Sequence, residues 1–250
     1  MPFKIAQNIM KKMTLLTTLL NLFIMNQLFA QSLQTDSFQT QDGKTVTVHF
    51  IRHASFFFTF DGVTIYADPV NYEGIDYNTL PKADVILVTH DHYDHLDKNA
   101  IAAISTSKTV IYCNKTAHEQ LVTGKILKNG DHISYHNIME IKAVPAYNTT
   151  EGRDQFHPKE RDNGYIITLG GTRIYIPGDC EDMPEMSEFK NIDVAFLPVN
   201  QPYTMTVAQA VNAAKILKPK ILYPIHYSDT DLKGLSVLKN EGVDVRVFKM

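Results

Sequence analysis

Residues 89–96, THDHYDHL, hold three histidines and an aspartate in the spacing His-x-His-x-Asp-His, directly after the apolar run VILV. Neutral imidazoles and carboxylates are ligands of first-row transition metals. Four of them can converge only if the chain turns sharply as it leaves a strand. The alternative is a polar turn that happens to be rich in histidine, but three of the ten histidines of this 250-residue chain fall in one short window. The stretch therefore predicts metal chemistry.

The order of these residues leaves room for two ions. If the chain stays extended, His90 and His92 point the same way and both can reach one ion. Asp94 and His95 come from the turn that follows, where they can serve a second ion. Two ions roughly 3.5–4 Å apart can hold a water or hydroxide between them. The motif therefore predicts hydrolysis.

The motif resembles the signature of the metallo-β-lactamase superfamily. Other stretches resemble the branch of that superfamily known only as metal-dependent hydrolases, namely residues 53–56 (HASF), 65–69 (IYADP), 178–179 (GD) and 224–227 (PIHY). The resemblance runs from about residue 46 to the C-terminus. It implies a four-layer αββα sandwich with a metal site on one edge between its halves, and metal-dependent hydrolysis as the activity.

The elements expected from the sequence agree with that fold. Asp61-Gly62 and Gly170-Gly171 predict hairpin turns, the first after short strands at 46–50 and 55–60. Further strands are expected at 63–67, 85–89, 109–113, 132–135, 138–144, 165–169, 172–176, 193–198, 220–224 and 243–248. Helices are expected at 97–105, 115–122, 182–189, 206–217 and 230–240. Hairpins followed by alternating helices and strands, twice over, predict a mixed α/β fold of two sheets packed face to face with helices outside.

Two further ligands are implied by the resemblance. Asp179, after a strand and a Pro-Gly pair, matches the superfamily's second acidic ligand, which bridges two ions. A turn aspartate after glycine is the alternative interpretation. His226, after another strand, matches the last histidine ligand, and a helix-cap or core histidine is its alternative.

One ligand of the superfamily pattern is missing. Members usually place a third histidine for the first ion just after a strand between the two halves. The corresponding residues here, 143–149 (AVPAYNT), include no histidine. Asn148 could coordinate through its amide oxygen, or His157 could fold back over the site. The first ion is therefore expected to bind more weakly than the second.

Four residues are candidate substrate contacts. His53 matches a residue that orients a ligand or contacts substrate in this branch, and a satisfied core histidine is its alternative. Asn200 and Tyr203 follow a strand at the edge where the metal loop must lie, and Tyr147 belongs to the stretch that lacks the histidine. Amides and a tyrosine suit a substrate with hydrogen-bonding groups.

The N-terminus has the layout of a secretory signal peptide. Lys4, Lys11 and Lys12 precede an apolar stretch at about residues 13–28, and the small residue Ala30 follows. A membrane anchor is the alternative, but the clean apolar run is shorter than the ~20 residues that a spanning helix needs. Cleavage after Ala30, a periplasmic location and no stable membrane insertion of the mature protein are expected.

The rest of the chain divides into a flexible lead-in and one domain. Residues 31–45 are polar and are expected to be mobile, and residues 46–250 are expected to form the hydrolase domain. The formal net charge of −3 offers no basic surface for nucleic acid. Cys113 ends an apolar strand and Cys180 follows Asp179, so no disulfide is expected between them.

Together these observations predict a metal-dependent hydrolase. The ions would be one or two zinc, with manganese or iron as alternatives, and the expected ligands are His90, His92, Asp94, His95, Asp179 and His226, with Asn148 or His157. A metal-bound hydroxide, oriented by Asp94, would attack an ester, lactone, amide or phosphodiester of a small molecule.

Other functions stay open. An exported metal- or ligand-binding protein without turnover is the main alternative, because of the missing histidine. A redox role is less favoured, since redox relatives resemble His-x-Glu-x-Asp where this chain has His92. A β-lactamase is less favoured because the residues around Asn148 are untypical. The oligomeric state stays open.

Overall fold

Residues 33–72 and 74–250 are described by the structure, a computed structural model. The predicted signal peptide, residues 1–30, lies outside the described residues. Residues Leu33–Met250 form one compact unit. Within those described residues, no helix has the length and apolarity needed to cross a membrane.

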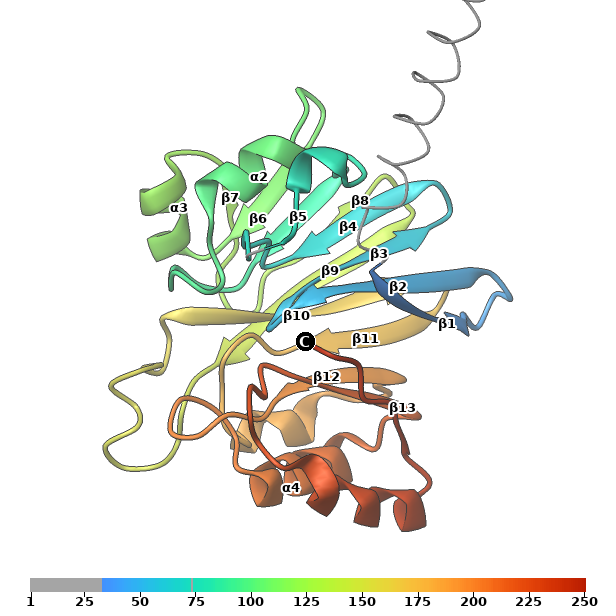
Figure 1. The fold of residues 1–250 in the computed structure, drawn as a ribbon, viewed down its shortest axis with the longest axis vertical. Coiled ribbons are helices and arrows are strands. Elements are labelled where there is room, and N and C mark those ends of the chain that lie inside the picture. Colours follow the sequence, from blue (N-terminus) through green and yellow to red (C-terminus); the bar gives the residue numbers. More distant parts are fainter. Residues whose placement is uncertain (1–32, 73) are drawn as a thin grey trace, which may run out of the picture. The chain divides into compact units, whose positions relative to one another are not determined.

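Each half of this unit forms a seven-stranded sheet (Figure 1). The first sheet consists, in order, of β1 (Gln34–Gln39), β2 (Thr45–Arg52), β3 (Ser55–Phe60), β4 (Val63–Ala67), β5 (Val85–Val88), β6 (Val110–Cys113) and β7 (Lys125–Ile126). The second consists of β8 (His132–Tyr135), β9 (Met139–Ala146), β10 (Asp162–Leu169), β11 (Thr172–Ile176), β12 (Val194–Pro198), β13 (Ile221–Ile225) and β14 (Asp244–Val245), with β14 and β8 at its edges.

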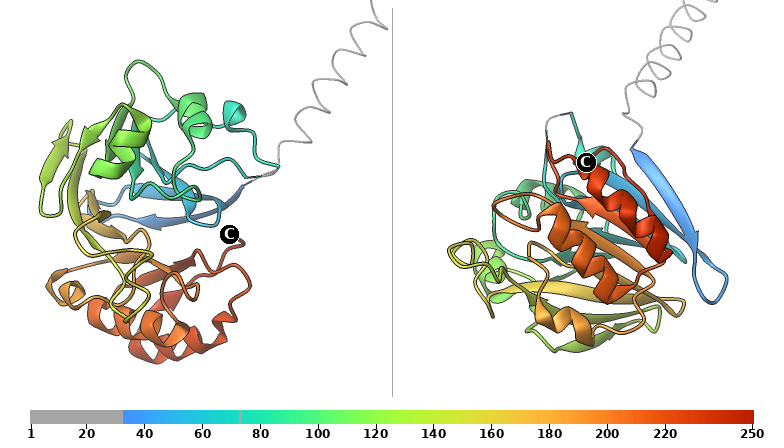
Figure 2. Two further views of the ribbon diagram at one scale, coloured as in Figure 1. Left: turned by 90° about the vertical axis from the view of Figure 1, so that its left-hand side faces the viewer. Right: turned by 90° about the horizontal axis from the view of Figure 1, so that it is seen from below.

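Both sheets change from antiparallel to parallel pairing along the chain. Strands β1 to β4 and β8 to β11 pair antiparallel, and the later strands of each sheet pair parallel. Parallel neighbours need crossover connections. The crossovers carry the helical segments η1 (Tyr77–Thr79), α2 (Lys98–Ile104), α3 (Lys115–Leu121), η2 (Pro184–Glu188), α4 (Val207–Leu217) and η3 (Leu232–Glu241). Figures 1 and 2 show α2 and α3 outside one sheet and α4 outside the other.

The alternation of side chains along the strands builds three apolar layers. In β3, Phe56 and Phe58 belong to the layer between the sheets, whereas Phe57 packs in the layer under α2 and α3. In β11, Ile174 lies between the sheets and Tyr175 lies in the layer under α4. Burying one such aromatic side chain stabilises the fold by roughly 1.5–3 kcal/mol, so a one-residue slip in register is strongly disfavoured. The predicted four-layer αββα sandwich is confirmed.

The segment expected to be a flexible lead-in is different in the structure. Gln34–Gln39 forms β1, an edge strand paired with β2. Asp36 accepts hydrogen bonds from the Tyr223 hydroxyl and from Arg246 Nη1, both at 2.9 Å. Only Phe38 of this strand is buried, so its sequence is polar enough to resemble a linker. Over these residues the expected lead-in is therefore a paired edge strand.

Two predicted helices are 3-10 segments. In η3, Leu235 and Leu238 are the buried residues, and their spacing of three matches the three residues per turn of a 3-10 helix. η2 begins with Pro184 and spans only five residues. By contrast, α4 starts where expected, because Thr206 and Gln209 form a capping box at its first turn.

The two cysteines are free and buried. Cys113 packs in the layer under α2 and α3, and Cys180 packs in the layer under α4. Both sheets lie between these layers, which explains why the two thiols do not meet.

Candidate metal centre

The candidate ligands come from one edge of the sandwich. His90 follows β5, Asp179 follows β11 and His226 directly follows β13. These are parallel strands, and the carboxyl ends of parallel strands lie at the same edge of a sheet, where α/β proteins commonly place their sites. The turn between β2 and β3 adds His53, and the loop between β9 and β10 adds His157.

Gly178 allows the two halves to approach each other at this edge. Its φ of +66° is unfavourable for other residues, and a Cβ atom there would lie 2.8 Å from Thr89 Cβ and 3.0 Å from the Asn163 carbonyl oxygen. The Asn163 N–H also donates to the Thr89 carbonyl oxygen at 3.0 Å. This close contact brings Asp179 against the loop that carries the histidine motif.

The first cluster contains His90, His92 and His157, whose ligand atoms lie within 4.8 Å of one another. His157 Nδ1 lies 3.2 Å from the Asp162 carboxylate, which leaves Nε2 directed at Asp179, 3.4 Å away. A histidine that binds a metal through one ring nitrogen commonly donates a hydrogen bond to a carboxylate from its other ring nitrogen. His157 therefore has the arrangement of a ligand.

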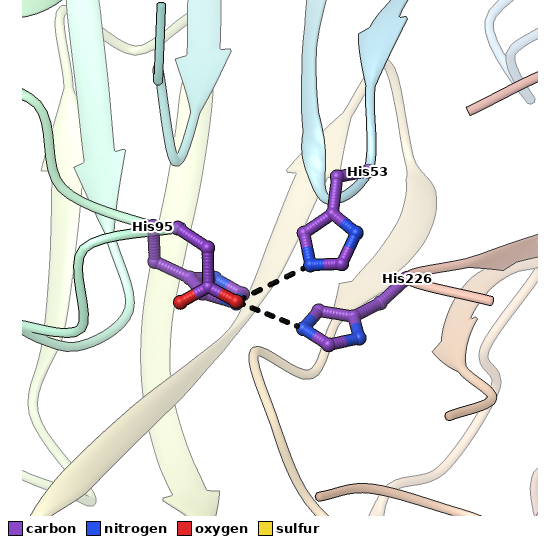
Figure 3. Close-up of side chains that lie close together, drawn as sticks. His53, His95 and His226 are labelled. Carbon is purple, nitrogen blue, oxygen red and sulfur yellow. Dashed lines mark hydrogen bonds and ion pairs between the residues drawn. The ribbon is translucent and has the colours of Figure 1, made fainter. Parts of the chain in front are cut away.

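The second cluster contains His53, Asp94, His95 and His226. Figure 3 shows His53 and His226 directed at one carboxylate oxygen, and their Nε2 atoms lie 3.3 and 3.4 Å from Asp94 Oδ2. His95 Nδ1 contacts Asp68 at 2.8 Å, so this ring too is fixed by a carboxylate behind it.

Asp179 lies between the clusters. Its Oδ2 atom is 3.4 Å from His157 Nε2 and 3.2 Å from His226 Nε2, and its Oδ1 atom is 3.2 Å from His95 Nε2. It also forms a third group of candidate ligands with His90 and His95. One carboxylate thus reaches both sets of imidazoles.

The backbone at this edge is strained. His53, Asp68 and His226 have φ values of 60°, 43° and 51°, in the left-handed region that non-glycine residues rarely adopt. The His226 N–H donates to the His53 carbonyl oxygen at 2.8 Å, which links two of these residues. Strained residues of this kind cluster at functional sites, where the surrounding structure holds them.

The charges of the site favour a neutral imidazole at His90 and an ionised carboxylate at Asp179. Burial lowers the pKa of His90 well below its usual value. Burial alone would raise the pKa of Asp179, but His226 and His95 outweigh it and hold that pKa well below normal. Burial likewise opposes protonation of His226, yet Asp179 and Asp94 raise its pKa to about 9.

Several buried atoms at this edge have no hydrogen-bond partner among the described residues. They include Nε2 of His90 and Nδ1 of His226, whereas Nε2 of His95 and Nε2 of His226 make only contacts of 3.2–3.4 Å with the carboxylates of Asp179 and Asp94. Buried polar atoms are ordinarily paired. Imidazole nitrogens and carboxylate oxygens are also the donors that zinc and related divalent ions prefer. The residues of the site therefore fit a divalent metal ion.

The N–H groups of Asn148 donate to backbone carbonyl oxygens, and its buried amide oxygen Oδ1 has no hydrogen-bond partner among the described residues. Its Nδ2 donates to the Tyr203 and Arg153 carbonyl oxygens at 2.7 and 3.2 Å, and its N–H donates to the His157 carbonyl oxygen at 2.9 Å. Of the two alternatives for the missing ligand, the structure brings His157 into the first cluster. Asn148 holds the loop on which His157 lies.

A cavity of about 520 Å³ opens over the two clusters. His53, Asn200 and Tyr203, three of the four predicted substrate contacts, line it. Tyr147 does not. It is buried in the layer under α4, and its hydroxyl donates to Glu185 at 2.6 Å. The prediction for Tyr147 is therefore corrected, because its ring faces the core.

Sequence reasoning missed the carboxylates behind the histidines. Asp68 directly follows β4, which pairs parallel with β5, so its position at the shared strand edge was a usable signal. Asp162 begins β10, and nothing in the sequence connects it with His157. The cavity-lining residues Tyr72, Phe156 and Ser228 were missed as well.

Comparisons with known proteins agree with this geometry. Residues 47–226 match the family model described as "Beta-lactamase superfamily domain". The chain is similar to the UPF0173 metal-dependent hydrolase of Pyrococcus abyssi, with 32% identity over 195 residues, 73% of this chain and 85% of the relative. It is also similar to the UPF0173 metal-dependent hydrolase of Archaeoglobus fulgidus, with 30% identity over 66% of this chain and 78% of the relative.

Solved structures show the same fold. A crystal structure from Parabacteroides distasonis, described as that of a candidate metal-dependent hydrolase, is 54% identical, with a TM-score of 0.84 over 87% of this chain and 99% of its own. The metallo hydrolase Igni18 of Ignicoccus hospitalis is 24% identical, with a TM-score of 0.68 over 82% of this chain and 95% of its own, and shows the fold alone. The chain belongs to the beta-lactamase superfamily, and within it is a metal-dependent hydrolase of the UPF0173 family.

Proposed function

We propose that this hydrolase uses two divalent ions, most simply zinc. His90, His92 and His157 would hold the first ion, Asp94, His95 and His226 the second, and Asp179 would lie between them. The observation that carries the proposal is the position of Asp179, which is within 3.4 Å of imidazole nitrogens from both clusters. A shared carboxylate offsets the mutual repulsion of two cations.

The reaction would be hydrolysis of an ester, lactone, amide or phosphodiester in a small molecule. A divalent ion, when bound, lowers the pKa of its water toward about 7 and polarises the oxygen of the bond to be cleaved. The water oxygen bonds to the carbonyl carbon or phosphorus, the bond to the leaving oxygen or nitrogen breaks, and a water proton ends on the leaving group.

Asp94 would accept a hydrogen bond from the attacking water, and His53 would orient Asp94. Burial alone would raise the pKa of Asp94, but His226 and His53 lower it, so the carboxylate is ionised and can accept a hydrogen bond from water. His53 lines the cavity and lies 3.3 Å from Asp94 Oδ2. Burial lowers the pKa of His53, so the ring is neutral at pH 7 and can donate one hydrogen bond that orients Asp94.

The proposal is tested by removing and restoring the metal. We expect chelation to abolish turnover of at least one substrate in a panel of ester, lactone, amide and phosphodiester compounds. We expect zinc, manganese or iron to restore it. Asp179→Ala should lose at least one ion and nearly all activity, because it removes the shared carboxylate.

A metal-binding protein without turnover is the competing function. It would be favoured if added metal fills both positions and no compound in the panel is hydrolysed above background. Full metal content in Asp179→Ala would instead contradict the proposed ligand set.

We also propose that the protein is exported to the periplasm. The proposal rests on the lysines, the apolar stretch and Ala30 in residues 1–30. N-terminal sequencing of the protein from its native host should give a first residue near Gln31. An intact Met1 on protein from the cytoplasm would contradict export.

A further inference from the structure

Four aromatic rings surround the cavity over the candidate metal centre. They are Tyr72, Tyr93, Phe156 and Tyr203, and each comes from a different loop. Tyr93 stands within the histidine motif itself and is 88% exposed, and Tyr203 is 46% exposed. Phe156 and Tyr203 meet edge to face, with ring centroids 5.0 Å apart. Exposed rings gathered around a cavity favour an apolar ligand, which would remove their surface from water.

Histidine is the only basic residue type among the described residues that line the cavity. Among the described residues, none of those lining the cavity is a lysine or an arginine. The Arg161 guanidinium is held by Asp162 at 2.7 and 2.8 Å and by the Phe156 carbonyl oxygen at 2.8 Å, and its Nη2 atom lies 3.3 Å from His92 Nε2. Arg153, on the same loop, pairs with Glu181 at 3.2 Å. These cations already have partners, so an anionic substituent in the cavity would find none among the lining residues.

The floor of the cavity supplies little surplus positive charge. Asp94 and Asp179 reach the candidate ligand nitrogens, and Asp68 and Asp162 stand behind His95 and His157. Asp162 is already paired with Arg161, so Asp68, Asp94 and Asp179 set three negative charges against the four positive charges of two divalent ions. An anionic phosphodiester would therefore meet only a small surplus of positive charge.

Neutral polar groups complete the lining. Asn200 and Ser228 face the cavity and make only a 3.5 Å contact with each other through their side chains. An amide and a hydroxyl can bind a carbonyl or ether oxygen without requiring charge. They lie in the same cavity as the aromatic rings.

We infer that the substrate is an uncharged ester, lactone or amide that carries an aromatic or comparably bulky apolar group, rather than a phosphodiester. This inference rests on the proposed function, because it names the substrate class of the same site. The aromatic rings bind the apolar group, and the reactive carbonyl lies over Asp94 and Asp179. Hydrolysis adds the water oxygen to that carbonyl carbon, breaks its bond to the leaving oxygen or nitrogen, and places a water proton on the leaving group, which gives an acid and an alcohol or amine, or one hydroxy acid from a lactone.

Binding of matched ligands to the purified, metal-loaded protein tests the inference. The probe is 4-phenylbutan-2-one, an uncharged isostere of benzyl acetate that cannot be hydrolysed. The comparison ligands are butan-2-one, which lacks the ring, and dibenzyl phosphate, which carries two such rings and a negative charge. We expect the probe to bind about tenfold more tightly than butan-2-one, and more tightly than dibenzyl phosphate, in calorimetric titrations.

Two variants identify the rings responsible. Tyr93→Ala and Tyr203→Ala should each reduce the preference for the probe over butan-2-one by about threefold or more, with unchanged metal content. Val122→Ala, which removes an exposed apolar side chain from the end of α3, should leave that preference unchanged. If both tyrosine variants keep the full preference, or dibenzyl phosphate binds most tightly, the inference is wrong.

The same experiment separates this inference from the proposed function. Preference for the probe without turnover of benzyl acetate or any other panel compound would contradict the hydrolytic function and support the ligand class. Metal-dependent turnover with tighter binding of dibenzyl phosphate would support the function and contradict the ligand class.

Discussion

At the scale of single residues, a carboxylate on the ring nitrogen that faces away from the site orients two of the candidate ligand histidines. Asp68 contacts His95 and Asp162 contacts His157, both through Nδ1. The residue types of the ligands are visible in the sequence, because His-x-His-x-Asp-His is compact. Their carboxylate partners are not, since Asp162 meets His157 only through the shape of a loop.

Substitution of His53 can distinguish two roles for this residue, orienting Asp94 and binding an ion. We expect His53→Ala to lower kcat about 10- to 100-fold, the range typical for partners that orient a metal ligand. His53→Gln should recover most of that loss, because its amide nitrogen can replace Nε2 as the donor to Asp94 Oδ2, 3.3 Å away. Steady-state kinetics and metal analysis of both variants provide the measurement.

Metal content decides how that result is interpreted. Both His53 variants should keep the ions of the unmodified protein if the ring only orients Asp94. A lost ion in both variants would mean that His53 is itself a ligand, as its place in the second cluster permits.

At the scale of elements, the loop between β9 and β10 determines whether the first cluster is complete. Glu181, whose side chain is fully buried, accepts hydrogen bonds from the N–H groups of Thr149 and Thr150 at 2.8 and 2.7 Å. It also pairs with Arg153 at 3.2 Å. One carboxylate thereby holds the first part of the loop that presents His157.

We expect Glu181→Gln to weaken binding of one ion more than the other. The amide cannot accept all of these hydrogen bonds, so the fold should lose about 1–3 kcal/mol of stability and the loop should hold His157 less firmly. Zinc titration and thermal unfolding provide the measurement. His157→Ala is the matched variant that removes the ring itself.

Glu185→Gln is the control for this loop. Glu185 pairs with the exposed Lys159 at 2.9 Å, and the amide oxygen of glutamine can still accept the hydrogen bond from the Tyr147 hydroxyl, so the substitution should change stability by less than about 1 kcal/mol. If Glu181→Gln binds each ion with the same affinity as the unmodified protein, the loop does not depend on this carboxylate.

At the scale of the whole molecule, the alternation of side chains made the layers predictable. Hairpin turns at Asp61-Gly62 and Gly170-Gly171 and apolar strands on either side of them are local signals, and both hairpins are present. Strand β1 was not predictable, because its partners Tyr223 and Arg246 lie about two hundred residues away in sequence. His157 stayed one of two alternatives in the sequence, because the position of its loop depends on contacts from Glu181 and Asn148.

Asp193 links distant parts of the molecule and should make stability depend on pH. It pairs with Lys220 at 2.8 Å, and accepts hydrogen bonds from the Arg173 N–H at 3.0 Å and the Gln41 amide at 3.2 Å. Burial alone would raise the pKa of Asp193, but Lys220 and the Arg173 N–H outweigh it and lower that pKa.

Asp193→Asn tests that link. A lowered folded-state pKa means that the stabilisation is present above the unfolded value of about 3.8 and is lost as the pH falls through the folded value. The variant should therefore be less stable by roughly 1–3 kcal/mol at pH 7, and the difference should shrink as the pH falls below 4. Urea unfolding of both proteins at several pH values is the measurement. A difference in unfolding free energy that does not change with pH would contradict the role given to the Asp193 carboxylate.

The central claim is that two ions bind on either side of Asp179. Anomalous X-ray diffraction from zinc-loaded crystals, recorded on both sides of the zinc absorption edge, tests it most directly. We predict two peaks roughly 3.5–4 Å apart, one beside His90, His92 and His157 and the other beside Asp94, His95 and His226, with the Asp179 carboxylate in contact with both. A single peak at full zinc saturation, or two peaks of which neither contacts Asp179, would contradict the account.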